Sequence, residues 1–314
     1  MKRHELWRQQ YRLRRYMVNL KEDDLHQRAK DVINNLTLLN EEAKISLPKL
    51  SSDTEKWMIL WTHVLEEFVI RFGPYPAGFK AGGMKDVIIP DPRSHNAPKA
   101  ANAVKSTSLP QGDYFFKYGK SKYLKQALNE HRIRISPASS YGDPSLNPAI
   151  RDEELELSIY PLPSELNIKA YDGKTGAHKG DIHPENFVYT ARSKTNYYVY
   201  CLSLSFAPRL FLDFDADACL VIRKPNEFQE MILSIFESKL KDWSGGGERV
   251  VYIDPLNCPV ADIDVFSSKD FRYSYQREYR FIWLPPNAEQ NLDNILIEVP
   301  DIAEYCYLIN LSET

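Results

Sequence analysis

Two pairs of polar residues sit at alternate positions in otherwise apolar segments, and their types and spacing are suited to chemistry. Ser203 and Ser205 alternate with leucines, and Gln276 and Glu278 come directly before the apolar run 279–284. Side chains two apart on a strand share a face, and polar groups on such a face are costly to bury without partners. The spacing therefore predicts that these hydroxyl, amide and carboxylate groups face something other than the core, as the polar groups of a binding or catalytic site do.

The order of these pairs along the chain resembles the ADP-ribosyltransferase superfamily. Its members place a polar residue on a first strand, Ser-x-Ser or an equivalent on a second, and Gln- or Glu-x-Glu leading into a third. In this sequence the three segments are residues 114–118, 203–205 and 276–278. The resemblance covers about residues 112–310 and implies a split β-sheet that uses NAD as a substrate.

A finer likeness is to an uncharacterised bacterial group with this fold that is often found among phage-defence genes. Its members run FKYG, a helix, a strand ending in Ser-Pro, a turn with Asp-Pro, then SLSF, and finally Glu before YRF. The matching segments here are residues 116–119, 136–137, 143–144, 203–206 and 278–281. The likeness implies a toxin-like effector of antiviral defence, with an antitoxin or regulatory partner.

The resemblance implies a mono-ADP-ribosyltransferase, a glycosyltransferase that moves ADP-ribose from NAD to a macromolecule. Breaking the bond between nicotinamide and ribose gives the sugar oxocarbenium character, which a nearby carboxylate stabilises. By the resemblance Glu278 has this role, Gln276 hydrogen-bonds the acceptor nucleophile, and Ser203 supports the carboxylate or the ribose.

The residues expected to hold NAD are Lys117, Tyr118, Arg134, Tyr141 and Ser205. The superfamily usually carries Arg or His on the first strand to anchor NAD, whereas this segment has Lys117 and Tyr118. The anchor therefore stays open between these two residues and Arg134 on the next strand. Tyr118 or Tyr141 is expected to stack on the nicotinamide ring, and no metal is expected.

Two other functions remain open. An NAD glycohydrolase on the same fold would pass ADP-ribose to water. A non-catalytic binding or regulatory protein would keep only the fold. For Glu278 itself, the alternative to catalysis is a plain ion pair with Arg277 or Arg280 at an exposed strand end.

Other familiar motifs fail on their spacing or context. Six residues separate Gly112 from Gly119, where a phosphate-binding P-loop has four. His178 and His183 lack the nearby cysteines or helical pattern of a metal site. The glycine run at 244–247 precedes a strand, whereas a dinucleotide fingerprint follows one, so it predicts a flexible turn.

The composition is that of a globular protein without a bias toward nucleic acid or membrane. The chain has 314 residues, 43% of them hydrophobic, and a formal net charge of −3. This length allows roughly two folding units. The four cysteines are widely spaced without a CxxC pair, which favours free thiols and a cytoplasmic location. The sequence has no apolar run long enough to suggest a membrane span or a secretory signal.

Residues 1–72 are expected to form a helical N-terminal region. Residues 3–44 contain no Gly or Pro, and residues 52–55 (Ser-Asp-Thr-Glu) predict a capped helix that ends at Gly73. Basic residues gather near the N-terminus, at Lys2, Arg3, Arg8, Arg12, Arg14 and Arg15. Such a face slightly favours RNA or DNA as the acceptor, whereas the acidic balance of the whole chain favours protein.

The rest of the chain divides into a Pro- and Gly-rich segment at 73–111 and an α+β domain at 112–314. The first is predicted to be a connector or a mobile lid, with Val87, Ile88 and Ile89 as an anchor. The second is the ADP-ribosyltransferase-like domain. Its predicted helices are 121–130, 148–157 and 226–241. Its predicted strands are 114–118, 132–135, 197–205, 218–223, 250–253, 278–284, 295–299 and 305–309.

Overall fold

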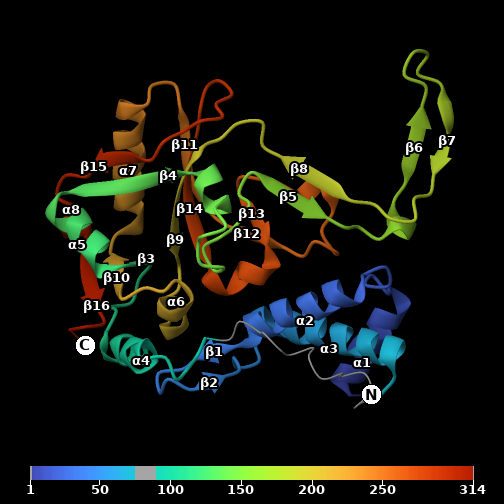
Figure 1. Cartoon of the computed structure of the whole chain (residues 1–314), viewed down its shortest axis with the longest axis horizontal. Helices are drawn as coiled ribbons and strands as arrows, with labels where there is room; N and C mark the ends of the chain where they lie inside the picture. Colours follow the sequence, from blue (N-terminus) through green and yellow to red (C-terminus); the bar gives the residue numbers. More distant parts are fainter. Residues whose placement is uncertain (1, 75–89, 314) are drawn as a thin grey trace.

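The computed structural model describes residues 2–74 and 90–313. It confirms a mixed helix-and-strand fold, in which three N-terminal helices lie against a body built on a large antiparallel sheet (Figure 1). The helices are α1 (Arg3–Leu13), α2 (Glu22–Leu36), α3 (Ser52–Phe72), α4 (Asn96–Ser106), α5 (Ser121–Asn129), α6 (Pro208–Asp213), α7 (Pro225–Lys239) and α8 (Ile302–Tyr305).

The sheet has eight strands, and six of them form a path in the order β11-β14-β9-β3-β10-β16. The remaining two, β4 and β15, pair with each other, and β4 also pairs with β9. The eight strands are β3 (Phe115–Gly119), β4 (Arg132–Pro137), β9 (Tyr198–Ser203), β10 (Ala218–Ile222), β11 (Ser244–Arg249), β14 (Glu278–Leu284), β15 (Ile295–Glu298) and β16 (Cys306–Asn310).

The central strand β9 divides one of its edges between two neighbours. Strand β14 pairs with it along the other edge, from Tyr198 opposite Trp283 to Ser203 opposite Glu278. On the divided edge, β3 pairs only at Ser203, whereas β4 pairs at Tyr198 and Val199. Strands β3 and β4 therefore diverge from β9, and the sheet is split at this fork. The three segments expected to carry the site thus lie side by side as β3, β9 and β14.

Smaller two-stranded sheets complete the strand-rich part, and two of them form hairpins that the sequence patterns did not predict. In Figure 1 the β6–β7 hairpin projects away from the body of the protein. These strands are β1 (Leu38–Leu39) with β2 (Ile45–Ser46), β5 (Glu156–Ile159) with β8 (Tyr189–Arg192), β6 (Ile168–Tyr171) with β7 (His178–Ile182), and β12 (Val251–Ile253) with β13 (Ser268–Asp270).

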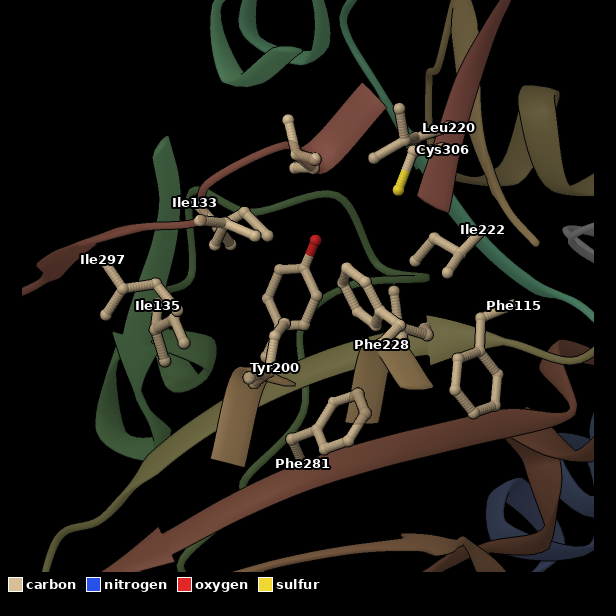
Figure 2. Packing of buried hydrophobic residues seen from close by; sticks show 14 of the residues in the cluster. Phe115, Ile133, Ile135, Tyr200, Leu220, Ile222, Phe228, Phe281, Ile297 and Cys306 are labelled. Atoms are coloured by element: carbon tan, nitrogen blue, oxygen red, sulfur yellow. The ribbon is translucent and has the colours of Figure 1, made fainter. Parts of the chain in front are cut away.

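The main core lies between one face of the sheet and helix α7 (Figure 2). Phe281 and Trp283 alternate along β14 toward this core, and the Trp283 ring stacks on Phe236 of α7 with 4.0 Å between ring centroids. Each such buried aromatic side chain stabilises the fold by roughly 1.5–3 kcal/mol. The alternation leaves Glu278 and Arg280 on the opposite face of β14.

The N-terminal helices share a core with the strand-rich body. Tyr11, Leu25 and Phe68 pack in one cluster with Leu256 and Phe271 from the C-terminal half. Helix α3 starts one residue earlier than the predicted capping box, with Ser51 as its N-cap and Thr54 as the partner.

The basic face predicted for α1 is bound within the protein. Arg12 lies 2.5 Å and Arg8 3.4 Å from carboxylate oxygens of Glu66, and Arg15 lies 2.7 Å from Glu67. Both carboxylates are buried on α3. Arg8 and Arg12 share Glu66, and Arg15 shares Glu67 with Arg71. The arginine charges that favoured a nucleic-acid acceptor are therefore neutralised only in part, because two carboxylates face four guanidinium groups.

Two predicted segments take another structure. Residues 148–155 form turns and loop, and a strand starts at Glu156, so the helix predicted at 148–157 is wrong. The glycine run predicted as a flexible turn lies in strand β11. Gly245 stands opposite Trp283, and a Cβ there would lie 2.6 Å from that ring. Glycine is used here because the aromatic rings of β14 cover the backbone.

Of the predicted lid, residues 73–74 and 90–111 are described, whereas Val87, Ile88 and Ile89 lie outside the described residues. Helix α4 occupies the middle half of the part from 90 to 111. Its Ala100 and Ala103 pack with Phe211 in a second core on the other side of β3.

We expect Gly245→Ala to destabilise the protein by about 1–3 kcal/mol, because the added methyl group overpacks the strand against the Trp283 ring. Gly246→Ala is the matched control, since a Cβ there meets no atom within 4 Å. Urea unfolding of the two variants and the wild type measures the difference. Equal losses in both variants would contradict this account of β11.

Candidate functional site

Ser203 and Glu278 face each other across the β9–β14 pair, so the structure brings two of the predicted catalytic residues together. The Ser203 hydroxyl donates to the main-chain oxygen of Gln276 at 2.7 Å and accepts from the Ser205 amide at 3.0 Å. Between Gln276 and Glu278, Arg277 has a φ of 47°. This left-handed residue turns the chain into β14.

Gln276 does not share a strand face with Glu278, contrary to the sequence expectation. It ends the 3-10 helix η4 (Phe271–Gln276), and its side chain is buried. Its Nε2 donates to the main-chain oxygen of Ala149 at 2.7 Å. Gln276 therefore holds the loop that was predicted to be a helix.

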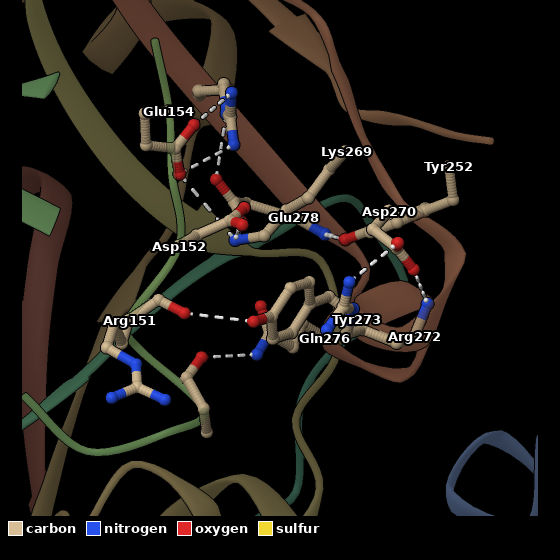
Figure 3. A network of polar contacts seen from close by, with 12 residues as sticks. Arg151, Asp152, Glu154, Tyr252, Lys269, Asp270, Arg272, Tyr273, Gln276 and Glu278 are labelled. Carbon is tan, nitrogen blue, oxygen red and sulfur yellow. Dashed lines mark hydrogen bonds and ion pairs between the residues drawn. The ribbon is translucent and has the colours of Figure 1, made fainter. Parts of the chain in front are cut away.

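Glu278 belongs to a buried network of charged groups (Figure 3). Its carboxylate accepts from Lys269 Nζ at 3.0 Å and from Arg280 Nε at 2.9 Å. Two further carboxylates close the network. Glu154 lies 2.8 Å from Arg280, and Asp152 lies 3.5 Å from Lys269. With all groups ionised, three carboxylates face two cations and leave one excess negative charge.

The network shifts the pKa values of its two glutamates in opposite directions. Burial alone raises the pKa of Glu278, but the Lys269 and Arg280 charges outweigh it and hold the pKa below its usual value. Burial also raises the pKa of Glu154, where the same cations do not outweigh it. Glu278 is thus the carboxylate that the network keeps ionised.

A pocket of about 530 Å³ lies at the fork between β3 and β4. We call it the fork pocket. Four of the five residues expected to hold NAD line it, namely Lys117, Tyr118, Arg134 and Tyr141. Its volume falls in the usual range of small-molecule sites. Ser205, the fifth, is not part of the lining.

Two cations in the fork pocket have no carboxylate partner among the described residues. Lys117 Nζ donates to the main-chain oxygen of Cys201 at 2.8 Å and lies 4.5 Å from the centroid of the Tyr200 ring. Burial lowers its pKa. Arg134, on β4, also forms no ion pair within the described chain. Other basic lining residues are paired, as Lys120 is with Asp215. The free cations make the pocket suited to an anionic ligand such as a phosphate group.

Tyr141 and Cys201 lie between the fork pocket and the charged network. Tyr141 lines the pocket. Burial raises its pKa well above the usual value, and the nearby Cys201 thiol and the carboxylates of Glu154 and Glu278 raise it further. Cys201 likewise contributes to the lowered pKa of Glu278. The network therefore begins directly behind these two side chains.

The aromatic ring expected to stack on a ligand is better provided by Tyr141 than by Tyr118. The Tyr118 hydroxyl donates to Ser205 O at 2.9 Å and accepts from the Ala207 amide at 3.0 Å. Its ring packs edge-on against Phe211. Tyr118 is therefore fixed in the core at the pocket wall.

Three members of the network were missed in the sequence. Asp152 and Glu154 stand in a segment that was interpreted as helix, and Lys269 stands in Ser-Ser-Lys-Asp, which matches no motif. Arg280 was named as an ion-pair partner of Glu278, and this pair is confirmed, although it is buried instead of exposed. Arg277 is not part of it.

In the described part of the chain, no group of three or more His, Cys, Asp or Glu side chains is arranged to hold a metal ion. Among the same residues, none of the helices has the length and apolar character needed to cross a bilayer. Comparisons with protein families, with curated proteins and with solved structures find no match for this chain.

We expect Lys269→Met to cost about 3–5 kcal/mol of stability near neutral pH, because it leaves two buried carboxylates and the partly buried Asp152 with one cation. The loss should shrink as the pH falls, since protonation of Glu154, whose pKa is raised by burial, removes one of the two excess negative charges. Glu278→Gln is the control: two carboxylates then balance two cations, and the loss should be smaller. Urea unfolding at pH 7 and pH 5 measures both effects. A loss in Lys269→Met that does not exceed that in Glu278→Gln would refute this charge balance.

Proposed function

We propose that this protein is a mono-ADP-ribosyltransferase that binds NAD in the fork pocket and transfers ADP-ribose to a macromolecule. One observation carries the proposal. Residues expected to hold NAD, from β3, β4 and the segment after β4, line one pocket, and the expected catalytic carboxylate lies behind Tyr141 of that pocket. The split sheet, with β3, β9 and β14 adjacent, supports the same function.

The charges of the two regions are suited to the two halves of the reaction. Lys117 and Arg134 would bind the diphosphate of NAD, because both are cations without a counter-ion. The excess negative charge of the network would stabilise the positive charge that develops on the ribose as nicotinamide leaves. Glu278 is the carboxylate whose pKa the network holds below its usual value, and Ser203 fixes the start of its strand.

The acceptor is proposed to be a protein. Arg12 of α1 pairs with Glu66 and Arg15, just after α1, pairs with Glu67, which weakens the observation that favoured RNA or DNA. The acidic balance of the chain, with a net charge of −3, then favours a protein. The likeness to phage-defence proteins supports a cytoplasmic effector held in check by a regulatory partner.

A second candidate is a non-catalytic NAD-binding or regulatory protein. The burial of Glu278 favours it: the residue is 5% exposed, and Lys269 and Arg280 both occupy its carboxylate. In this function the fork pocket would bind NAD, and the network would serve stability alone.

Incubation of the protein with labelled NAD and cell extract separates the two candidates. We expect label to be transferred to protein by the wild type and to fall by about two orders of magnitude in Glu278→Gln, as for loss of a group that acts on the transition state. Protease and nuclease digestion of the product identify the acceptor class. Free ADP-ribose without labelled macromolecule would indicate an NAD glycohydrolase, and label transfer that survives the substitution would remove Glu278 from the mechanism.

NAD binding is expected to weaken about tenfold or more in Lys117→Met and in Arg134→Gln, which corresponds to about 1.4 kcal/mol. Each variant removes an unpaired cation from the fork pocket. Lys125→Gln is the matched control, because Lys125 is exposed on α5 and pairs with Glu313 outside the pocket. Calorimetric titration with NAD measures the three affinities. If all three variants bind NAD as the wild type does, the ligand is held elsewhere.

A further inference from the structure

The 3-10 helix η4, which leads into Gln276 and Glu278, is held in place by an asparagine of the N-terminal helices. Asn35 lies near the end of α2 and is 8% exposed. Its Nδ2 lies 3.1 Å from Phe271 O and 3.2 Å from Arg272 O, and its Oδ1 accepts from the Tyr275 amide at 2.9 Å. Its Nδ2 also lies 2.9 Å from Asp31 O within α2. One side chain thus contacts main-chain groups near both ends of η4 and ties them to α2.

Other groups at the same junction fix the rings of η4. The Arg209 guanidinium of α6 lies 3.8 Å from the centroid of the Tyr275 ring and donates to Thr37 O, just after α2, at 2.7 Å. The Phe271 ring stacks on Trp57 of α3 with 5.7 Å between centroids. The junction is therefore rigid, and Asn35 provides its main-chain contacts.

The chain between the Asn35 contact and Glu278 is short. Tyr275, whose amide donates a hydrogen bond to Asn35 Oδ1, directly precedes Gln276. Arg277 follows in a left-handed conformation, and its main-chain oxygen accepts from the Leu204 amide at 2.8 Å. Glu278 then enters β14. A shift of η4 would therefore move Gln276 away from Ala149 and the Glu278 carboxylate away from Lys269.

We propose that Asn35 is a positioning residue that acts through the main chain of η4 on Gln276 and Glu278. The inference rests on the proposed function insofar as Glu278 acts on NAD. It makes the helical N-terminal region part of the structure that positions the site. The contacts with the substrate remain those of the fork pocket, which Asn35 does not line.

The test compares Asn35→Ala with Asn34→Ala. Asn34 is the neighbour on α2 with similar burial, 9% exposed, and its side-chain oxygen has no hydrogen-bond partner within the described residues. In Asn35→Ala we expect kcat to fall about tenfold or more while the NAD Kd stays within about twofold. Amide exchange should rise about tenfold at residues 273–278 and not in α1 or α3. In Asn34→Ala both measurements should stay within about twofold of the wild type.

Asn35→Asp adds a second variant, because aspartate keeps the acceptor for the Tyr275 amide but replaces the donor by a carboxylate oxygen that repels the two carbonyls. It should disturb kcat and exchange at residues 273–278 at least as much as Asn35→Ala. Equal kcat and equal exchange in the alanine variants of Asn34 and Asn35 would overturn the proposal. If the wild type does not turn over NAD, the proposed function fails, and exchange decides the positioning role alone. Faster exchange confined to 273–278 supports it, and unchanged or uniformly faster exchange overturns it.

Discussion

The site depends on how hydrogen bonds are shared along one edge of strand β9. A main-chain group on a strand edge can pair with only one neighbouring strand. Because β3 takes the end of this edge at Ser203 and β4 takes the end at Tyr198, the two strands cannot also pair with each other next to β9. They diverge, and side chains from both line the space that is left. The fork pocket is thus a consequence of strand pairing. Its two unpaired cations, Lys117 and Arg134, lie on the diverging strands β3 and β4.

The second constraint is the burial of charge behind that pocket. Removing Lys269, Arg280 and their carboxylate partners from water costs several kcal/mol per ion, which ion pairing must offset. This offset requires close contacts between three parts of the chain, namely the 152–154 loop, β13 and β14. The loop cannot form a helix and also place both Asp152 and Glu154 against these cations. Tertiary contacts here override a helical pattern, which is the general limit of local propensity.

The sequence patterns predicted strands well in the apolar segments that became β9, β10 and β14. The resemblance indicated Ser203 and Glu278, which lie on neighbouring strands, and four residues that line the fork pocket. The patterns failed where a long-range contact decided the local structure. The glycines of β11 form a strand because Trp283 and Phe281 lie over them, and Gln276 leaves the strand because Ala149 and α2 hold its segment. No local pattern carries such information. For the same reason, no local pattern predicts that Lys269 lies beside Glu278.

The strand order also fixes when the site can come into existence during synthesis. Neighbours in the sheet are distant in sequence: β3, near residue 117, pairs with β9 near 200, and β9 pairs with β14 near 280. Pairings of this separation carry a large loop-closure entropy and form slowly. A nascent chain holds the fork residues of β3 and β4 long before it holds Lys269 and Glu278. The lining also includes Leu296 of β15, the strand that pairs with β4. The pocket and the charged network behind it are therefore both completed late in synthesis, and an incomplete chain that lacks β14 and β15 has neither.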